Sequence, residues 1–254
     1  MSASANTLPA RVLVIGGSSG VGRRVVEELT ARGSRCAIGY STNDDAARTA
    51  CEAAAARGIE PILAKGDMAK AAPELVRQAV EGLGGLDGLV ITAVPVITGR
   101  ALSLTAEQHE RITGVLMWGL LDTVRSALPH FEASGGGVVV IVTSLGARLY
   151  TKYYGTLGPA KAAAEAYVRT LAAELGPRQV RINALAPCLI DDELHTSYSS
   201  SARDFLEPVA RRTPLRRLAK PQDIANATIA LLGSDLAFVT GQVIDVDGGY
   251  SLMG

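Results

Sequence analysis

The feature of this 254-residue chain that most constrains its fold is a glycine-rich turn between a short apolar strand and an amphipathic helix. The run RVLVI at residues 11–15 predicts a buried strand, and the turn at residues 16–22 has the spacing Gly-x3-Gly-x-Gly. Val25, Val26 and Leu29 then follow at helical spacing. Because free N–H groups at a helix N-terminus attract anions, this order is typical of a dinucleotide diphosphate site. A glycine turn without a ligand is the alternative, which its place between strand and helix disfavours.

The rest of the chain alternates apolar β-branched runs with helical patterns. The further strands are expected at residues 35–40, 60–65, 89–93, 138–142, 179–186 and 242–247. The helices between them are expected at residues 46–57, 71–83, 104–127, 160–175 and 221–232, with Leu128-Pro129 closing the third. Strict alternation predicts a parallel sheet. The fold class is therefore α/β, with one Rossmann-like domain over residues 1–254, a doubly wound parallel sheet of about seven strands and helices on both faces.

Composition and charge exclude several classes of protein. The chain is 48% hydrophobic and carries 25 basic and 25 acidic residues, which gives no indication of a nucleic-acid or membrane partner. Residues 1–10 lack the pattern of a signal peptide. Its three cysteines have no CxxC spacing and its three histidines are scattered, so neither disulfides nor a bound metal is expected. A cytoplasmic protein is the expectation.

The predicted second strand ends without the acid that holds a ribose 2′-hydroxyl in NAD-binding folds. The residues there are Tyr40, Ser41 and Thr42, whose hydroxyls could bind a 2′-phosphate together with Arg23, so we expect NADPH in preference to NADH. Asp67, after the third strand, could accept from the adenine amino group or cap the next helix. The full set of expected cofactor-binding residues is Gly16, Ser18, Ser19, Gly20, Val21, Gly22, Tyr40, Ser41, Thr42, Asp67, Met68, Ala93, Lys161, Pro187 and Ile190.

The stretch SLGARLYTKYYGTLGPAK, residues 144–161, joins the buried strand 138–142 to the helix with the stripe 160–175. It brings one hydroxyl, Ser144, three phenols and the Lys161 ammonium to one region of the chain. Proton donation to a substrate is the chemistry that such groups supply.

With these residues in view, the chain resembles the short-chain dehydrogenase/reductase superfamily over nearly its whole length. The matching features are the glycine turn, Asp67, Ser144, Lys161, Asn183-Ala184, Pro187 and Asp247-Gly248-Gly249. Common members also carry Tyr-x3-Lys, an Asn-Asn-Ala-Gly stretch, a helix asparagine and a threonine after Pro-Gly. Here these positions hold Leu157, Ile91-Thr92-Ala93-Val94, Leu116 and Asp192.

The spacing of Tyr150, Tyr154 and Lys161 resembles the enoyl-acyl-carrier-protein reductases with Tyr-x6-Lys and a GxxxGxG turn. The resemblance implies reduction of a C=C bond conjugated to a thioester. Tyr154 would then donate to the thioester oxygen, Lys161 would bind the nicotinamide ribose, and Tyr150 would shape the substrate end. Ser144 would position substrate or hold the loop. The thioester carrier is open between coenzyme A and acyl carrier protein.

Two other functions compete with this hypothesis. A carbonyl or imine reductase of the same superfamily could use Tyr153 or Tyr154 as its acid. A catalytically silent binding protein is the other alternative, because Asp192 would place a carboxylate near the cofactor diphosphate. The irregular segment 189–214 is expected to be a substrate lid, or else a surface excursion. The resemblance implies a homo-oligomer, a tetramer or dimer, and the nearly consecutive apolar residues 115–121 agree.

Overall fold

The computed structural model describes residues 7–192 and 202–253 and contains one parallel sheet. Its seven strands lie in the order β3-β2-β1-β4-β5-β6-β7. Their bounds are β1 Arg11–Ile15, β2 Arg35–Tyr40, β3 Ile62–Lys65, β4 Gly88–Ile91, β5 Gly137–Val142, β6 Val180–Pro187 and β7 Val243–Val246. The predicted fold class is confirmed, and each strand agrees with its predicted range to within two residues at either end.

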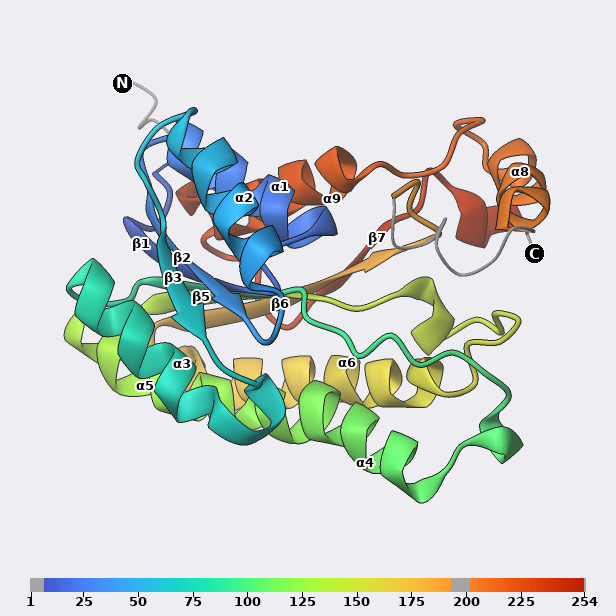
Figure 1. Cartoon of the computed structure of the whole chain (residues 1–254), viewed down its shortest axis with the longest axis horizontal. Coiled ribbons are helices and arrows are strands. Elements are labelled where there is room, and N and C mark those ends of the chain that lie inside the picture. Colours follow the sequence, from blue (N-terminus) through green and yellow to red (C-terminus); the bar gives the residue numbers. More distant parts are fainter. Residues whose placement is uncertain (1–6, 193–201, 254) are drawn as a thin grey trace.

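Helices cover both faces of the sheet (Figure 1). On one face lie α1 Gly20–Ala31, α2 Asp44–Ala55 and α9 Pro221–Leu232. On the other lie α3 Met68–Leu83, α4 Ala106–Thr113, α5 Leu120–Ala133 and α6 Leu157–Leu175. Helix α8, Ala202–Arg212, lies beyond the end of the sheet, near the C-terminus (Figure 1). Within the described ranges, no helix is long and apolar enough to cross a membrane.

Strand β1 shows why both faces need helices. Val12 and Val14 point into the cluster under α1, α2 and α9, while Leu13 and Ile15 point into the cluster under α3 to α6. Successive side chains of a strand alternate between faces, so a strand covered on both sides is apolar throughout. Burial on both faces explains why residues 12–15 form an unbroken apolar run.

The long helix predicted at residues 104–127 is observed as three contiguous parts. Between α4 and α5, residues Gly114–Gly119 form a π-helical segment, a distortion that frequently marks functional sites. The expectation that Pro129 ends the helix is wrong, because α5 continues to Ala133. Phe131, completely buried, explains this: its ring packs where a Cβ on Gly137 would stand, which holds the last turn against β5.

Candidate active site

A pocket of about 920 Å³ lies at the carboxyl ends of the strands. Its wall includes residues that directly follow six adjacent strands, β1 to β6. The strand order reverses direction between β1 and β4, the point where ligands bind in open α/β sheets. The pocket wall contains every predicted cofactor-binding residue except Thr42 and every predicted catalytic residue except Tyr150.

The tight turn before α1, of the kind that binds a dinucleotide diphosphate, requires glycine because side chains there would collide with the backbone. A Cβ on Gly16 would stand 2.8 Å from the Ala93 nitrogen, and one on Gly22 would stand 2.2 Å from the Gly16 carbonyl oxygen. Gly16 also has a φ of +85°, which L side chains rarely adopt. Within the described part of the chain, the Ser19 side chain makes no capping hydrogen bond, and the first residues of α1 line the pocket.

Asp192 lies beside this turn, as its place in the sequence suggested. Its Oδ2 atom is 3.6 Å from the position of a Cβ on Gly20, and both residues line the pocket. The first turn of α1 has no acidic residue of its own. A carboxylate here is attracted by the helix N-terminus and repels a bound diphosphate.

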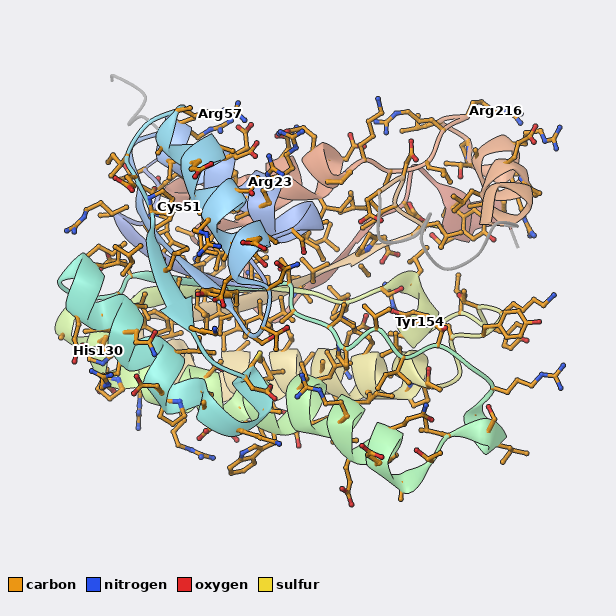
Figure 2. All side chains as sticks on the ribbon, in the orientation of Figure 1. Arg23, Cys51, Arg57, His130, Tyr154 and Arg216 are labelled. Carbon is orange, nitrogen blue, oxygen red and sulfur yellow. The ribbon has the colours of Figure 1, made fainter. Side chains whose placement is uncertain are left out.

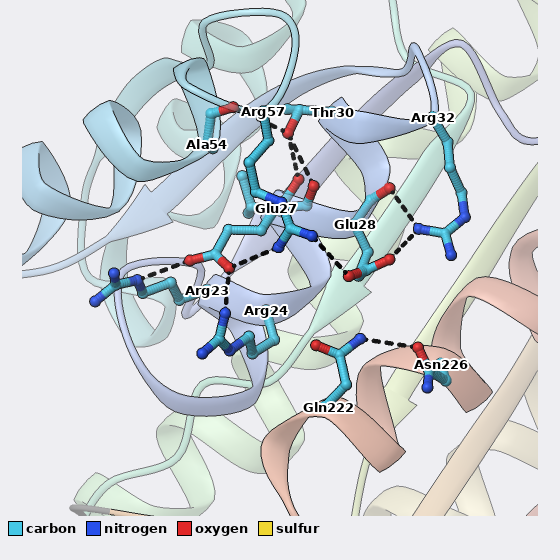
Figure 3. Close-up of polar contacts among 11 residues, drawn as sticks. Arg23, Arg24, Glu27, Glu28, Thr30, Arg32, Ala54, Arg57, Gln222 and Asn226 are labelled. Atoms are coloured by element: carbon cyan, nitrogen blue, oxygen red, sulfur yellow. Dashed lines mark hydrogen bonds and ion pairs between the residues drawn. The ribbon is translucent and has the colours of Figure 1, made fainter.

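Arg23, expected from the sequence to contact a 2′-phosphate, is paired with the Glu27 carboxylate in the structure. Arg23 Nε donates to Glu27 at 3.0 Å, and the same carboxylate receives Arg24 at 2.6 Å and Arg57 at 3.1 Å. Figure 3 shows these arginines converging on Glu27, whose side chain is buried. Arg23 is therefore one of three cationic partners that the buried carboxylate needs.

Asp67 caps α3, as predicted, by accepting from the Ala69 nitrogen at 3.0 Å. It also pairs with Arg111 of α4 at 2.6 Å, which the sequence gave no reason to expect. Burial raises the pKa of the Asp67 carboxyl, but these contacts together outweigh it, so the pKa is lowered. Arg111 lines the pocket, and no spacing connects two residues this far apart in the chain, so only the folded structure reveals the pair.

Lys161, in the second turn of α6, has a buried side chain, and its Nζ donates to the Val142 carbonyl oxygen at 2.7 Å. Burial lowers the pKa of Lys161 to about 8, an effect that the nearby Glu165 carboxylate opposes. The ammonium therefore stays charged at neutral pH but loses its proton within reach of mildly alkaline pH.

Tyr154 lies three residues before α6 begins, on the loop, as Pro159 in the first turn predicted. Its ring packs on the backbone of Gly146, where a Cβ would stand 2.4 Å from Tyr154 Cδ1. The adjoining backbone is fixed as well: the Gly99 nitrogen donates to the Tyr153 carbonyl oxygen at 2.8 Å, and the Thr156 hydroxyl to the Ile97 carbonyl oxygen at 2.7 Å. Figure 2 shows Tyr154 across the sheet from the layer that carries Arg23.

The other hydroxyl groups of the loop differ in whether they line the pocket. Tyr153 lines the pocket with a positive φ of 63°, whereas Tyr150 is 92% exposed and lies outside the pocket wall. Ser144 lines the pocket and also accepts from the Gly146 nitrogen at 3.1 Å, which holds the loop as the sequence allowed. The structure therefore brings Ser144, Tyr154 and Lys161 to one cavity.

A family model described as "Enoyl-(Acyl carrier protein) reductase" matches residues 16–251. The chain belongs to this family of short-chain dehydrogenases/reductases. A 3-oxoacyl-[acyl-carrier-protein] reductase of Staphylococcus epidermidis is 29% identical over 244 residues, covering 93% of this chain and 97% of the relative. An L-rhamnose 1-dehydrogenase (NAD(P)(+)) of a Sphingomonas species is 31% identical over 243 residues, covering 94% of both.

A solved structure of a short-chain type dehydrogenase/reductase from Mycobacterium ulcerans superposes with a TM-score of 0.87 at 29% identity, covering 97% of this chain and 91% of that one. This chain is thus a nicotinamide-dependent oxidoreductase of the superfamily. Among the residues that the structure describes, no group of acidic, histidine and cysteine side chains could hold a metal ion.

Two of the departures from the common members of the superfamily are apolar and buried in this oxidoreductase. Leu157, at the usual tyrosine position, is 3% exposed, and Leu116, at the usual helix asparagine, lies in the π-helical segment. Neither can move a proton. Among the described residues, the phenols on the pocket wall are instead Tyr40, Tyr153 and Tyr154, and of these Tyr154 is packed against the core.

A polar network that the sequence did not reveal supports the loop that carries Ser144 and Tyr154 in this oxidoreductase. The buried Glu165 carboxylate accepts from the Thr143 hydroxyl at 3.0 Å and pairs with Arg148 Nε at 3.4 Å. Arg148 also pairs with Asp245 on β7. The loop that carries Ser144 and Tyr154 is thereby tied to α6 and to the edge strand of the sheet.

Proposed function

We propose that this reductase uses NADPH to reduce the C=C bond of an enoyl thioester. The observation that carries the proposal is the exchange of roles between two positions: buried Leu157 replaces the usual phenol, and the ring of Tyr154, anchored on Gly146, lines the pocket with Lys161. In the proposed substrate, the oxygen that accepts the hydrogen bond is not attached to the carbon that receives the hydride. A phenol at the earlier loop position 154, in place of one at 157, suits this separation. In a conjugated enoyl thioester, the hydride goes to the β-carbon while charge develops on the thioester oxygen.

The chain's residues then have defined tasks. The nicotinamide, when bound, supplies the hydride. Tyr154 donates a hydrogen bond to the thioester oxygen and stabilises its developing negative charge. A proton from water then adds to the α-carbon, which converts the enolate to the saturated thioester. Lys161 holds the nicotinamide ribose hydroxyls and places its positive charge beside the same oxygen. Ser144 holds the Leu145–Ala147 turn against which Tyr154 packs.

The cofactor preference for NADPH over NADH rests on the end of β2. Tyr40 and Ser41 line the pocket there, and neither is an acid that would hold a free 2′-hydroxyl. Thr42 is exposed and lies outside the wall. Residues 189–214 are proposed as a substrate lid, with Leu189 and Leu206 contributing to the pocket wall and residues 193–201 outside the described part.

The assembly and carrier are also proposals. Trp118 is 52% exposed on the surface formed with α4 and α5, which supports burial of that surface in a homodimer or homotetramer. We propose a cytoplasmic enzyme whose thioester substrate is carried by coenzyme A or an acyl carrier protein.

Carbonyl reduction is the second candidate. It is favoured by the relatives, whose names give a 3-oxoacyl reductase and a sugar dehydrogenase. In that chemistry, Tyr153 or Tyr154 would protonate the carbonyl oxygen directly. The buried leucine at 157 weighs against it, because the usual proton donor of that reaction is missing.

Consumption of NADPH by the purified protein distinguishes the two. Crotonyl, longer-chain and cyclic enoyl thioesters of coenzyme A are compared with acetoacetyl-coenzyme A at equal concentrations. Turnover of the enoyl thioesters without turnover of the oxoacyl thioester is expected. Turnover of the oxoacyl thioester alone would establish carbonyl reduction.

A further inference from the structure

A cluster of charged and phenolic groups at the carboxyl ends of β2 and β3 has no role in the chemistry described above. Tyr40 and Lys65 are paired in register on these neighbouring strands. The Asp44 carboxylate, at the start of α2, accepts from the Tyr40 hydroxyl at 2.9 Å and from Lys65 Nζ at 2.8 Å. The Lys65 ammonium also lies 5.9 Å from the centre of the Tyr40 ring.

This cluster borders the adenosine end of the pocket. Tyr40, Ser41 and Gly66, the residues that directly follow or end β2 and β3, all line the pocket wall. A 2′-phosphate on the adenosine ribose would project toward the end of β2. It would need a cation within reach, because without one the phosphate dianion loses more hydration free energy than its contacts with the protein return.

Among the described residues, the other cations near the pocket are held elsewhere. Lys152 of the pocket wall lies 5.2 Å from the centre of the Tyr153 ring. Arg111 pairs with Asp67, and buried Lys161 donates to the Val142 carbonyl oxygen at the opposite end. Arg23 is held by Glu27 (Figure 3). Lys65, next to pocket-lining Gly66, faces Tyr40, whereas the nearby Arg48 pairs with Asp45.

The Lys65–Asp44 pair is suited to an exchange of partners. Its side chains are 53% and 46% exposed, and an ion pair so exposed contributes little free energy. A lysine on a flexible stem can therefore turn from a single carboxylate to a doubly charged phosphate at small cost. The Tyr40 hydroxyl remains at hand to donate to either group.

We propose that Lys65 selects NADPH by leaving Asp44 to bind the 2′-phosphate, and that Asp44 opposes this selection. The inference rests on the NADPH preference proposed above and identifies the residues responsible for it. Asp44 competes with the phosphate for the ammonium and repels it, so the two residues set the cofactor preference in opposite directions. No part of this depends on which substrate is reduced.

The test is calorimetric titration of the whole protein with NADPH and, separately, NADH. Lys65→Met is expected to weaken NADPH binding about tenfold or more and to change NADH binding less than about twofold. Asp44→Asn is expected to tighten NADPH binding about threefold or more. The matched control is Lys70→Met, which removes the same charge from an exposed position on α3 that is not a partner of Asp44.

Each outcome decides a separate point. Retained NADH binding shows that the variants are folded. Equal weakening of both cofactors by Lys65→Met, or an equal effect of Lys70→Met, would overturn the assignment of Lys65. Weaker NADH binding in Asp44→Asn would instead make Asp44 the acceptor of a free ribose hydroxyl. Tighter binding of NADH by the parent would refute the NADPH preference itself, whereas NADPH preference with an unaffected Lys65→Met variant refutes only this inference.

Discussion

The ring of Tyr154 occupies the space that a side chain on Gly146 would need. A Cβ at 146 would stand 2.4 Å from Tyr154 Cδ1, a separation that forces the ring to move. Ser144 fixes the same turn by accepting from the Gly146 nitrogen at 3.1 Å. The position of the proposed hydrogen-bond donor is thus set by a glycine eight residues earlier in the chain.

Gly146→Ala should therefore displace the Tyr154 ring. We expect turnover to fall about tenfold or more while the Kd for NADPH changes less than about twofold, since misplacing a catalytic group by about 1 Å can cost about 100-fold. Steady-state kinetics and cofactor titration measure the two effects. Gly176→Ala is the control, because a Cβ there meets no atom within 4 Å. Unchanged turnover in Gly146→Ala would separate Tyr154 from the reaction.

Tyr154→Phe should lose about 100- to 1000-fold in turnover, the usual cost of removing one donor aimed at an oxyanion. Tyr153→Phe should lose far less, because Tyr153 is 53% exposed and Tyr154 packs against the core. Both variants should bind NADPH like the parent. The measurement is turnover of all three proteins on one enoyl thioester, and equal rates for Tyr154→Phe and the parent would refute the role assigned to Tyr154.

Asp192→Asn should tighten cofactor binding. The Asp192 carboxylate lies beside Gly20, at the helix N-terminus where the diphosphate is expected, so its charge competes with the cofactor. A gain of about three- to tenfold in affinity for NADPH and NADH alike is expected, and it should shrink as salt screens the charge. Titrations at low and high ionic strength check this. An affinity that is unchanged or lower in the variant would show that the carboxylate turns away when the cofactor binds.

The sheet and the cofactor turn could be predicted because their causes are local in sequence. The strand at 138–142 is an unbroken run of β-branched residues, and Gly16 and Gly22 stand where a Cβ would meet the backbone. The Asp67–Arg111 pair had no such local cause, because it depends on how the π-helical segment that follows α4 packs on α3. Nor could the sequence show that Tyr150 is exposed. The spacing of Tyr150 matches a family pattern, but that spacing does not determine the geometry of the loop.

Pro129 illustrates the same limit in a helix. A proline inside a helix removes one hydrogen bond, and from local preference alone it predicts an end. The buried Phe131 ring two residues later packs over Gly137 and holds one more turn in place. Tertiary packing outweighs the local cost of the proline, and the residues around position 129 do not indicate this packing.

The charge on Lys161 leads to a prediction about pH. Burial lowers the pKa of this ammonium from 10.5 to about 8, and the Glu165 carboxylate raises it. Since the unfolded chain keeps its proton at higher pH, it binds more protons than the folded chain between about pH 8 and pH 10.5. The contribution of Lys161 to stability is thus unfavourable below pH 8 and is relieved as pH rises through that window. Lys161→Met should remove this part of the pH dependence of the unfolding free energy.

Activity should depend on the same proton in the opposite sense. If the charged ammonium is the active form, turnover falls as pH rises through about 8, the folded-state pKa of Lys161. Glu165→Gln removes the carboxylate that raises this pKa, so the alkaline limb of the pH profile should move to lower pH. Glu174→Gln, an exposed position on the same helix, should leave the limb in place. The comparison is kcat/KM against pH for the three proteins. Because a loss of folding would lower the whole profile without moving its limb, a limb at the same pH in Glu165→Gln and the parent would show that the Glu165 charge does not act on Lys161.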